Sequence, residues 1–188
     1  SGDTITLSTA MTSGRIDLGD SAADSLTLSA SANSLTVANV ETLTGGRSSD
    51  VITLSDSLTR GSLDLGAGDD SLTLANAGNT VTIRNIETLT GGTGGDAVTI
   101  GTAVSASFDL AGGDDTLTLS AGGTITATNI ESVVGGTGND AVTLGSQVTG
   151  AAIDLKTGND KLTLGDFVNT LTVTNVETLT GGSTADTV

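Results

Sequence analysis

Short stretches in which apolar and polar residues alternate recur along the whole chain. Asp50-Val51-Ile52-Thr53-Leu54 and Asp70-Ser71-Leu72-Thr73-Leu74 are two of them, and each places an apolar side chain at every second position. Alternation with period two predicts a β-strand with one buried face. Apolar stripes at helical spacing do not occur, and Gly, Asn, Asp and Ser lie between the stretches, where the chain must turn. The pattern therefore predicts an all-β protein of short strands.

The stretches belong to a longer repeat. The segment that begins Asn39-Val40-Glu41-Thr42 returns at Asn85, Asn129 and Asn175, at offsets of 46, 44 and 46 residues. A unit that cannot bury its own apolar face must stack on its copies, so this repetition predicts one solenoid. We divide the chain into a partial repeat 1–38, repeats 39–84, 85–128 and 129–174, and a partial repeat 175–188. Because it opens and closes within a repeat, we expect a fragment of a longer protein.

Aspartates divide each repeat further. They lie 21, 26, 20, 26, 19, 25, 20 and 26 residues apart and are, in order, Asp3, Asp24, Asp50, Asp70, Asp96, Asp115, Asp140, Asp160 and Asp186. This spacing predicts two stacked turns per repeat, of about 20 and 26 residues, and about eight turns in all. Like strands of successive turns would pair in parallel, about 4.8 Å apart. The extra residues of the long turns predict a third side there.

Three other sets of polar residues recur once per repeat. Asn39 and its equivalents at Asn85, Asn129 and Asn175 follow an inward-pointing strand, and we interpret them as a stacked amide ladder; ordinary turn asparagines are the alternative. The recurring acids are Asp17, Asp64, Asp109 and Asp154, and Glu41, Glu87, Glu131 and Glu177. A catalytic pair is a single asymmetric constellation, whereas these acids repeat in every unit. We interpret them as a solvated strand face and expect no enzymatic activity.

Composition removes several classes of function. The chain contains no His, Cys, Trp or Tyr. That inventory excludes thiol nucleophiles, Ser-His-Asp triads, the usual zinc, copper and haem sites, and aromatic platforms for bases or sugars. With 22 acidic and 6 basic residues the formal net charge is −16, so nucleic acid is a poor partner. Hard cations are the natural ligands of such an acidic, oxygen-rich chain.

Two turns match a nonapeptide consensus in full. Residues 91–99 (GGTGGDAVT) and 135–143 (GGTGNDAVT) both fit G-G-x-G-x-D-x-U-x, in which U is a large apolar residue. Glycine permits tight turns with positive φ and leaves carbonyl oxygens bare, and the aspartate adds a carboxylate. A cation between two stacked turns would take oxygen ligands from both. The motif therefore predicts bound Ca²⁺; aspartate-rich turns that merely cap strands are the alternative.

Other turns keep part of the consensus and rank the candidate ligands. The turns that end at Asp70, Asp115 and Asp160 keep the glycine two residues before the aspartate, and two of them add a second acid. The metal-site candidates are Asp69, Asp70, Gly92, Gly94, Asp96, Gly113, Asp114, Asp115, Gly136, Gly138, Asp140, Gly158 and Asp160, with Asp24, Asp50 and Asp186 as weaker candidates. Arg47 and Lys156 lie in turns and oppose a continuous cation row.

The nonapeptide resembles that of the RTX, or repeats-in-toxin, calcium-binding proteins, and the aspartate register extends this resemblance over the chain. It implies a right-handed parallel β-roll or β-helix that folds on Ca²⁺, in a bacterial protein exported by type I secretion. The turns are longer than the roughly 18 residues of an ideal roll, so we expect calcium on one edge only. Repeats rich in Thr and Gly and free of Cys are also similar to Gram-negative surface-layer proteins and large surface adhesins.

We therefore expect a calcium-binding structural segment of a secreted bacterial surface-layer, extracellular filament or adhesin protein, which self-associates into a lattice or fibre. The alternative is a non-catalytic RTX module of a secreted polysaccharide-modifying enzyme or protease. Ice or surface binding by outward threonines such as Thr80 and Thr82 is a third hypothesis, although Arg84 interrupts the rows. We expect an extracellular or cell-surface location, no nucleic-acid partner and no membrane insertion, because no apolar run reaches spanning length.

Overall fold

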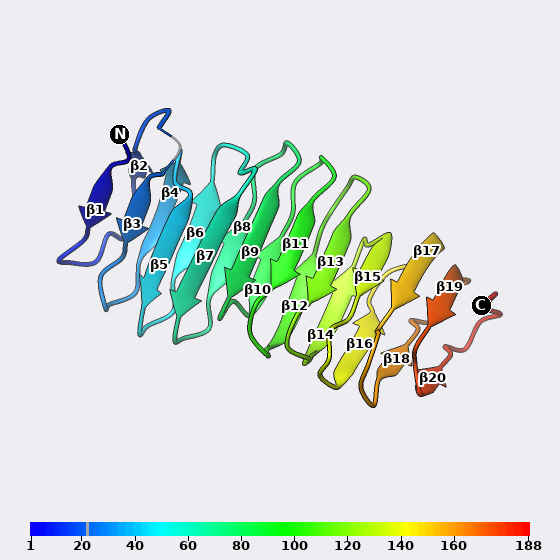
Figure 1. Cartoon of the computed structure of the whole chain (residues 1–188). Helices are drawn as coiled ribbons and strands as arrows, with labels where there is room; N and C mark the ends of the chain where they lie inside the picture. Colours follow the sequence, from blue (N-terminus) through cyan, green and yellow to red (C-terminus); the bar gives the residue numbers. More distant parts are fainter. Residues whose placement is uncertain (22) are drawn as a thin grey trace.

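Twenty short strands make up two parallel sheets in the computed structural model, which describes residues 1–21 and 23–188 (Figure 1). Sheet A contains β1 (Thr4–Thr6), β3 (Ser25–Thr27), β5 (Thr42–Gly46), β7 (Gly61–Gly66), β9 (Thr80–Arg84), β11 (Ala97–Ile100), β13 (Thr116–Leu119), β15 (Ser132–Val134), β17 (Thr149–Asp154) and β19 (Thr170–Thr174). Sheet B contains β2 (Arg15–Asp17), β4 (Ser34–Ala38), β6 (Val51–Leu54), β8 (Ser71–Thr73), β10 (Thr88–Thr90), β12 (Ser105–Asp109), β14 (Gly123–Thr128), β16 (Asp140–Leu144), β18 (Lys161–Thr163) and β20 (Thr178–Thr180).

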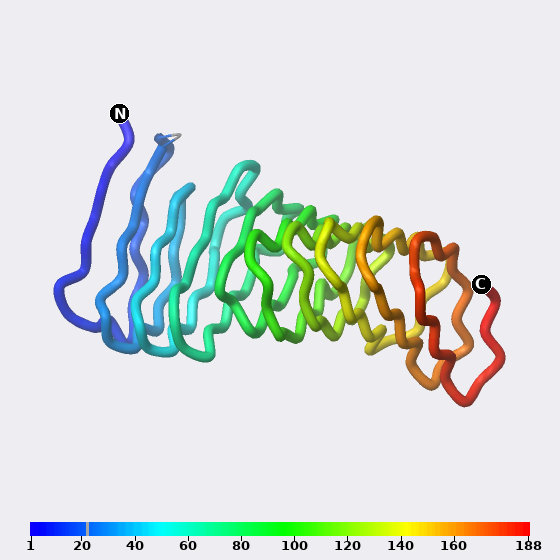
Figure 2. The backbone as a smooth tube through the Cα atoms, turned by 60° about the horizontal axis from the view of Figure 1, so that its bottom comes forward, coloured from blue at the N-terminus to red at the C-terminus, as the bar shows by residue number. Residues whose placement is uncertain are grey.

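The chain alternates between the sheets, so each turn of a coil supplies one strand to each. Figure 2 shows the coils stacked along one axis with the chain ends at opposite ends of the molecule. The prediction of an all-β parallel solenoid is confirmed. In the described part of the chain, no helix is long and apolar enough to cross a membrane.

The predicted lengths of the long turns were wrong. Hydrogen bonds between successive turns measure the length of a turn, because they join positions that lie one turn apart. One of them joins Asp24 to Glu41, which lies 17 residues later. The shortest of these steps is 16 residues, between Asp115 and Glu131, and the step from Asp3 to Asp24 is 21 residues. Each sheet has ten strands, and nine turns therefore separate its first strand from its last. The 26-residue turns, their third side and the count of eight turns are not part of the described structure.

One sequence repeat holds five strands, which is two and a half turns. Repeat 39–84 contains β5 to β9, and repeat 85–128 contains β10 to β14. Equivalent segments of successive repeats therefore fall in opposite sheets. The shorter intervals between aspartates cover one turn each. The longer interval from Asp70 to Asp96 covers one and a half turns, because it carries the chain from the start of β8 to the start of β11.

The core is a set of aliphatic rows that run along the coil axis. Leu26, Leu43 and Leu63 occupy one row of sheet A and are at most 1 % exposed. Full burial of such a side chain stabilises the fold by about 1.5–3 kcal/mol. Threonines alternate with these residues and cover the outside, as the period-two pattern predicts.

Asparagines in the left-handed region turn the chain at four equivalent corners. Asn39, Asn85, Asn129 and Asn175 have φ between 52° and 54°, a conformation that Asn adopts more readily than most residues. The Nδ2 atom of each donates to an aspartate Oδ1 one turn earlier at 2.7 Å, and the acceptors are Asp17, Asp64, Asp109 and Asp154. The stacked amide ladder was wrong, because equivalent asparagines lie two and a half turns apart.

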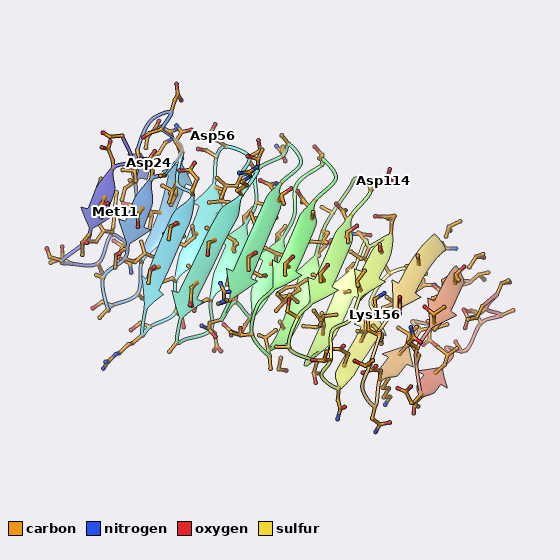
Figure 3. All side chains as sticks on the ribbon, in the orientation of Figure 1. Met11, Asp24, Asp56, Asp114 and Lys156 are labelled. Atoms are coloured by element: carbon orange, nitrogen blue, oxygen red, sulfur yellow. The ribbon has the colours of Figure 1, made fainter. Side chains whose placement is uncertain are left out.

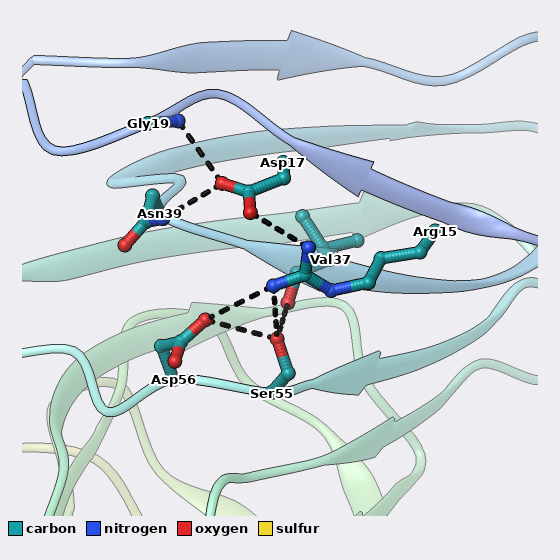
Figure 4. Close-up of polar contacts among 7 residues, drawn as sticks. All are labelled: Arg15, Asp17, Gly19, Val37, Asn39, Ser55 and Asp56. Atoms are coloured by element: carbon teal, nitrogen blue, oxygen red, sulfur yellow. Dashed lines mark hydrogen bonds and ion pairs between the residues drawn. The ribbon is translucent and has the colours of Figure 1, made fainter.

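The first of these corners carries an ion pair as well (Figure 4). Asp17 Oδ1 accepts from Asn39 Nδ2 and, at 3.1 Å, from the backbone N–H of Gly19, while Arg15 lies 2.6 Å from Oδ2. These hydrogen bonds, that of Asn39 above all, lower the pKa of Asp17 to about 2. Arg15 also lies 3.7 Å from Asp56, so its charge lies between the carboxylates of Asp17 and Asp56. The corner aspartates are therefore held by donors at the surface.

Candidate metal centres at the sheet edges

Acidic and amide side chains form a row along one edge of each sheet, at the side where its strands begin. In every member except Asp3 and Asp140, a side-chain oxygen accepts the backbone N–H of a residue one turn earlier, and these two donate their own backbone N–H to the next member. We call the two rows acid ladders. Ladder A contains Asp3, Asp24, Glu41, Asn79, Asp96, Asp115, Glu131, Asn169 and Asp186. Ladder B contains Asn33, Asp50, Asp70, Glu87, Asp140, Asp160 and Glu177.

The two ladders lie on opposite edges of the molecule, because the strands of the two sheets point in opposite directions (Figure 1). Figure 3 places Asp24 and Asp114 at the edge of ladder A and Lys156 toward the other edge. The candidate acids therefore lie on both edges, whereas the turn lengths lead us to expect calcium on one edge only. The two complete nonapeptides are separated in this way: Asp96 belongs to ladder A and Asp140 to ladder B.

Along each ladder the order Asn, Asp, Asp, Glu recurs. One complete set on ladder B is Asn33, Asp50, Asp70 and Glu87, in which successive N–H to oxygen distances are 2.8, 2.7 and 2.8 Å. The corresponding set on ladder A is Asn79, Asp96, Asp115 and Glu131, with 2.8, 2.7 and 2.9 Å. We call the two aspartates of a set the first and the second aspartate, because their surroundings differ.

In Asp50 and Asp96 the first aspartate has protein partners for both oxygens. Asp96 Oδ1 accepts from the backbone N–H and from Nδ2 of Asn79, both at 2.8 Å, and Oδ2 accepts from Gly92 N–H at 3.3 Å. Asp50 is bound in the same way by Asn33 and Gly46. The aspartate of the nonapeptide thus closes its own turn. Asp140 is the exception, since both its oxygens are buried without a partner.

The second aspartate always leaves one oxygen without a partner. Its Oδ1 accepts a hydrogen bond, but Oδ2 is buried and unpaired in all four copies, which are Asp24, Asp70, Asp115 and Asp160. Each side chain is at most 1 % exposed. The backbone N–H of each donates to a glutamate Oε2 of the next turn at 2.7 to 2.9 Å, and these glutamates are Glu41, Glu87, Glu131 and Glu177. Four equivalent Asp–Glu pairs result.

Burial raises the pKa of two of the second aspartates, Asp70 and Asp115. The pKa values of Asp70 and Asp115 rise to about 6, first because burial disfavours the charged form. The backbone N–H of the preceding aspartate opposes this rise, and the charges of the neighbouring acids, Asp50 and Glu87 in the case of Asp70, add to it. No ion pair in the described part of the chain offsets these carboxylates. Asp70 and Asp115 therefore bind a proton more readily than an ordinary aspartate does, and a bound cation would reduce the same cost of burying a charge.

The Asp–Glu pairs fit a hard cation. Each combines an unpaired carboxylate oxygen with a second carboxylate one strand spacing away, about 4.8 Å, and Ca²⁺ takes six to eight oxygen ligands in flexible geometry. Among the described residues, no three acidic side chains gather closely enough to hold a metal by themselves. A cation bound at a pair would therefore need backbone carbonyl oxygens and water to complete its shell.

The structure divides the predicted ligands among first aspartates, second aspartates and exposed residues, and this division differs from the ranking that the sequence motif gives. Asp70, Asp115 and Asp160 are second aspartates, and so is Asp24, which the motif ranks as weak. Asp50, Asp96 and Asp186 are first aspartates, and Asp186 Oδ1 accepts from Asn169 at 2.9 and 3.1 Å. Asp69 and Asp114 are exposed residues that precede second aspartates. Of the two complete motif matches, one therefore falls on Asp96, whose carboxylate the protein itself satisfies, and the other on Asp140, whose carboxylate oxygens have no partner.

The glycines of the nonapeptide are required by close stacking. A Cβ at Gly92 would lie 2.2 Å from the carbonyl oxygen of Ala75, and one at Gly136 would lie 2.6 Å from that of Leu119. Gly94, Gly138 and Gly158 are similarly crowded by the adjacent turn. Of the candidate glycines, Gly113 alone has φ in the left-handed region, at 134°. The expectation that these glycines serve positive-φ turns was wrong for the others.

Sequence reasoning missed the glutamates and the ladder asparagines. Their recurrence predicts a solvated face for Glu41 and its three equivalents, yet each accepts a backbone N–H from a second aspartate. A signal was present in the spacing. The second aspartate and the glutamate are separated by 17, 17, 16 and 17 residues, which is one turn.

No protein-family model, curated protein or solved structure matches this chain. The parallel solenoid is compatible with an RTX β-roll. The resemblance to RTX proteins therefore rests on the nonapeptide and on this architecture.

Proposed function

We propose that this chain is a calcium-binding structural segment of an extracellular bacterial protein related to the RTX proteins, of the surface-layer, filament or adhesin kind. The observation that carries the proposal is the buried Oδ2 atom without a partner that recurs in all four second aspartates, each beside a glutamate. A single unpaired carboxylate could be an accident of one turn. Four at equivalent positions indicate a feature that the repeat maintains.

Calcium at these pairs would convert a source of repulsion into cross-links between turns. The formal net charge is −16, and buried carboxylates at successive positions of a ladder repel one another. A ligand that binds only the folded state stabilises it by about 2.7 kcal/mol per site when its concentration is 100 times the dissociation constant. The cations would therefore stiffen the coil along its axis, which suits a structural segment that resists mechanical force.

Self-association into a lattice or fibre forms part of the proposal. The sides of the coil carry mainly threonines and acids, and exposed large apolar residues in the described chain are scattered, such as Val51 at 50 % and Val168 at 57 % exposure. Scattered apolar residues do not form a sticky patch. Cations that bridge exposed acids of neighbouring copies are therefore the contact we favour.

Neutralising the four glutamates should abolish most of the calcium response. In a quadruple variant with Glu41→Gln, Glu87→Gln, Glu131→Gln and Glu177→Gln, each glutamine oxygen can still accept the aspartate N–H, but the second charge of every pair is lost. We expect calcium affinity, measured by isothermal titration calorimetry, to fall at least tenfold per site, about 1.4 kcal/mol.

The matched control changes four other recurring acids to Asn, namely Asp17, Asp64, Asp109 and Asp154. This variant has the same net charge as the first, and each asparagine oxygen can still accept from the corner asparagine. We expect its calcium affinity to remain close to that of the unmodified chain. An equal loss in both variants would mean that calcium responds to overall charge, and the proposal would fail.

A further inference from the structure

Two arginines of sheet A have no counterpart in the other repeats. Arg60 lies four residues before a corner aspartate, and Arg84 lies directly before a corner asparagine. The other repeats carry neutral residues at these positions, which are Ser13, Ser105 and Gly150 for the first and Ala38, Thr128 and Thr174 for the second. The two positive charges therefore belong to repeat 39–84 alone.

Both arginines line a shallow groove on the outer face of sheet A. The groove has a volume of about 410 Å³ and crosses β7, β9 and β11. Its hydroxyl groups come from Thr80 and from a row of three residues that pair in register across these strands, Ser62, Thr82 and Thr99. All four side chains are exposed or half-buried, and a ligand on this face can reach them.

The arginines are separated along the strand direction. Gly61, the residue after Arg60, pairs in register with Val81, and Val81 lies three residues before Arg84. At about 3.3 Å per residue, the two arginines leave the backbone about 10 Å apart along the strands. The groove therefore presents two positive charges with hydroxyl groups between them.

Both guanidinium groups are available to a ligand. Arg60 is exposed and Arg84 half-buried, and neither has an ion-pair partner among the described residues. Asp64 pairs in register with Arg84, but its Oδ1 atom accepts instead from Asn85 Nδ2 at 2.7 Å. The side chain of Arg84 lies over Gly101 of the next turn, where a Cβ would come within 2.9 Å of its Nε atom. A glycine at that position leaves room for the arginine on the sheet face.

We propose that this groove binds a short acidic saccharide with at least two carboxylate groups, one for each arginine. A guanidinium group binds a carboxylate through two parallel N–H···O hydrogen bonds. The serine and threonine hydroxyls of the groove both donate and accept hydrogen bonds, as the hydroxyl groups of a sugar do. The volume of the groove falls within the range of small-molecule sites.

The groove suits a short saccharide better than a nucleic acid or a long polyanion. None of the described residues that line it is aromatic, so it offers no stacking platform for bases. The formal net charge of −16 repels a long polyanion. A short ligand responds mainly to the two arginines, because exposed charges more than about 8 Å away are largely screened at physiological ionic strength. The inference is independent of the proposed calcium function, since no member of the four Asp–Glu pairs lines the groove.

Binding can be tested by NMR on the whole chain in calcium-containing buffer, with trigalacturonate as the probe. Maltotriose is the matched neutral saccharide, and acetate supplies a carboxylate without a sugar. We expect trigalacturonate to shift the backbone amide signals of Ser62, Thr82 and Gly101 at millimolar concentration. Arg60→Gln and Arg84→Gln should each weaken this binding at least fivefold, because each removes one of the two charges that hold the ligand.

The matched control variant is Arg47→Gln, which removes the same charge from an exposed side chain outside the groove. We expect it to leave the binding unchanged. The inference is overturned if trigalacturonate shifts none of the three signals, or if maltotriose or acetate binds as tightly. It is also overturned if the two groove variants bind as well as the unmodified chain, which would indicate bridging by calcium, or if Arg47→Gln weakens binding as much as they do, which would indicate a response to overall charge.

Discussion

In calcium-free buffer, the folded chain is expected to be more stable near pH 5 than near pH 7. The pKa values of Asp70 and Asp115 are about 6 in the folded chain, against about 3.9 for an unfolded aspartate. Between these values the folded state binds more protons than the unfolded state. The stability that protonation provides is therefore complete below about pH 4 and is lost as the pH rises through 6.

Other aspartates set the lower limit of this window. Hydrogen bonds and a basic neighbour lower the pKa values of Asp17 and Asp154 to about 2. These groups stabilise the fold above the unfolded pKa, and their contribution disappears as the pH falls toward 2. Stability without calcium should therefore be greatest at about pH 4–5.

Calcium should shift this optimum toward neutral pH, since it competes with protons for the same carboxylates. Thermal unfolding followed by circular dichroism, with and without calcium across this pH range, measures both effects. For a chain of this size, 1 kcal/mol corresponds to about 2–4 °C in the midpoint. Greater stability near pH 7 than near pH 5 without calcium, or an equal calcium effect at both, would contradict the expectation.

The same substitution in consecutive turns of ladder B should have effects of opposite sign. Asp70→Asn removes a buried charge without a partner, and the remaining oxygen can still accept the Asp50 N–H, now at 2.7 Å. We expect stability in calcium-free buffer at neutral pH to rise by about 1–3 kcal/mol, because the neutral amide avoids the cost of a buried charge and its repulsion by Asp50 and Glu87. The calcium stabilisation of that one pair should be lost.

Asp50→Asn is the matched partner of this experiment. Asp50 is equally buried, but its oxygens accept from Asn33 twice and from Gly46. An asparagine there would direct an NH₂ group at one of these donors, and we expect a loss of about 1–3 kcal/mol. Urea unfolding of both variants, with and without calcium, gives the comparison. Changes of the same sign in calcium-free buffer would show that the two aspartates do not differ as their hydrogen bonds indicate.

Strand identity could be predicted from the sequence because it is local. In Asp50-Val51-Ile52-Thr53-Leu54 the alternation of side chains decides which face is buried, and the repeat length indicates stacking. The number of turns per repeat is not local. Asn33 and Asn79 occupy ladder positions without being aspartates, so counting aspartates omits these positions and makes one and a half turns resemble one.

The candidate site was predictable as a class of residue but not in its detail. The consensus drew attention to Asp96, whose carboxylate is satisfied by Asn79 and Gly92. The unpaired oxygen lies instead on the second aspartate, because Asp115 accepts the backbone N–H of Asp96 at Oδ1 but has no donor at Oδ2 equivalent to the Gly92 N–H. Which residue stacks on which depends on the register between turns, and a single motif does not contain that information.

The most direct test is to locate bound metal by anomalous diffraction from crystals grown with calcium or a lanthanide in its place. We predict four sites per chain, one at each second aspartate and its glutamate: Asp24 with Glu41, Asp70 with Glu87, Asp115 with Glu131, and Asp160 with Glu177. Metal at Asp50 and Asp96 in place of these pairs, or a fully folded chain that holds no metal under these conditions, would contradict the account.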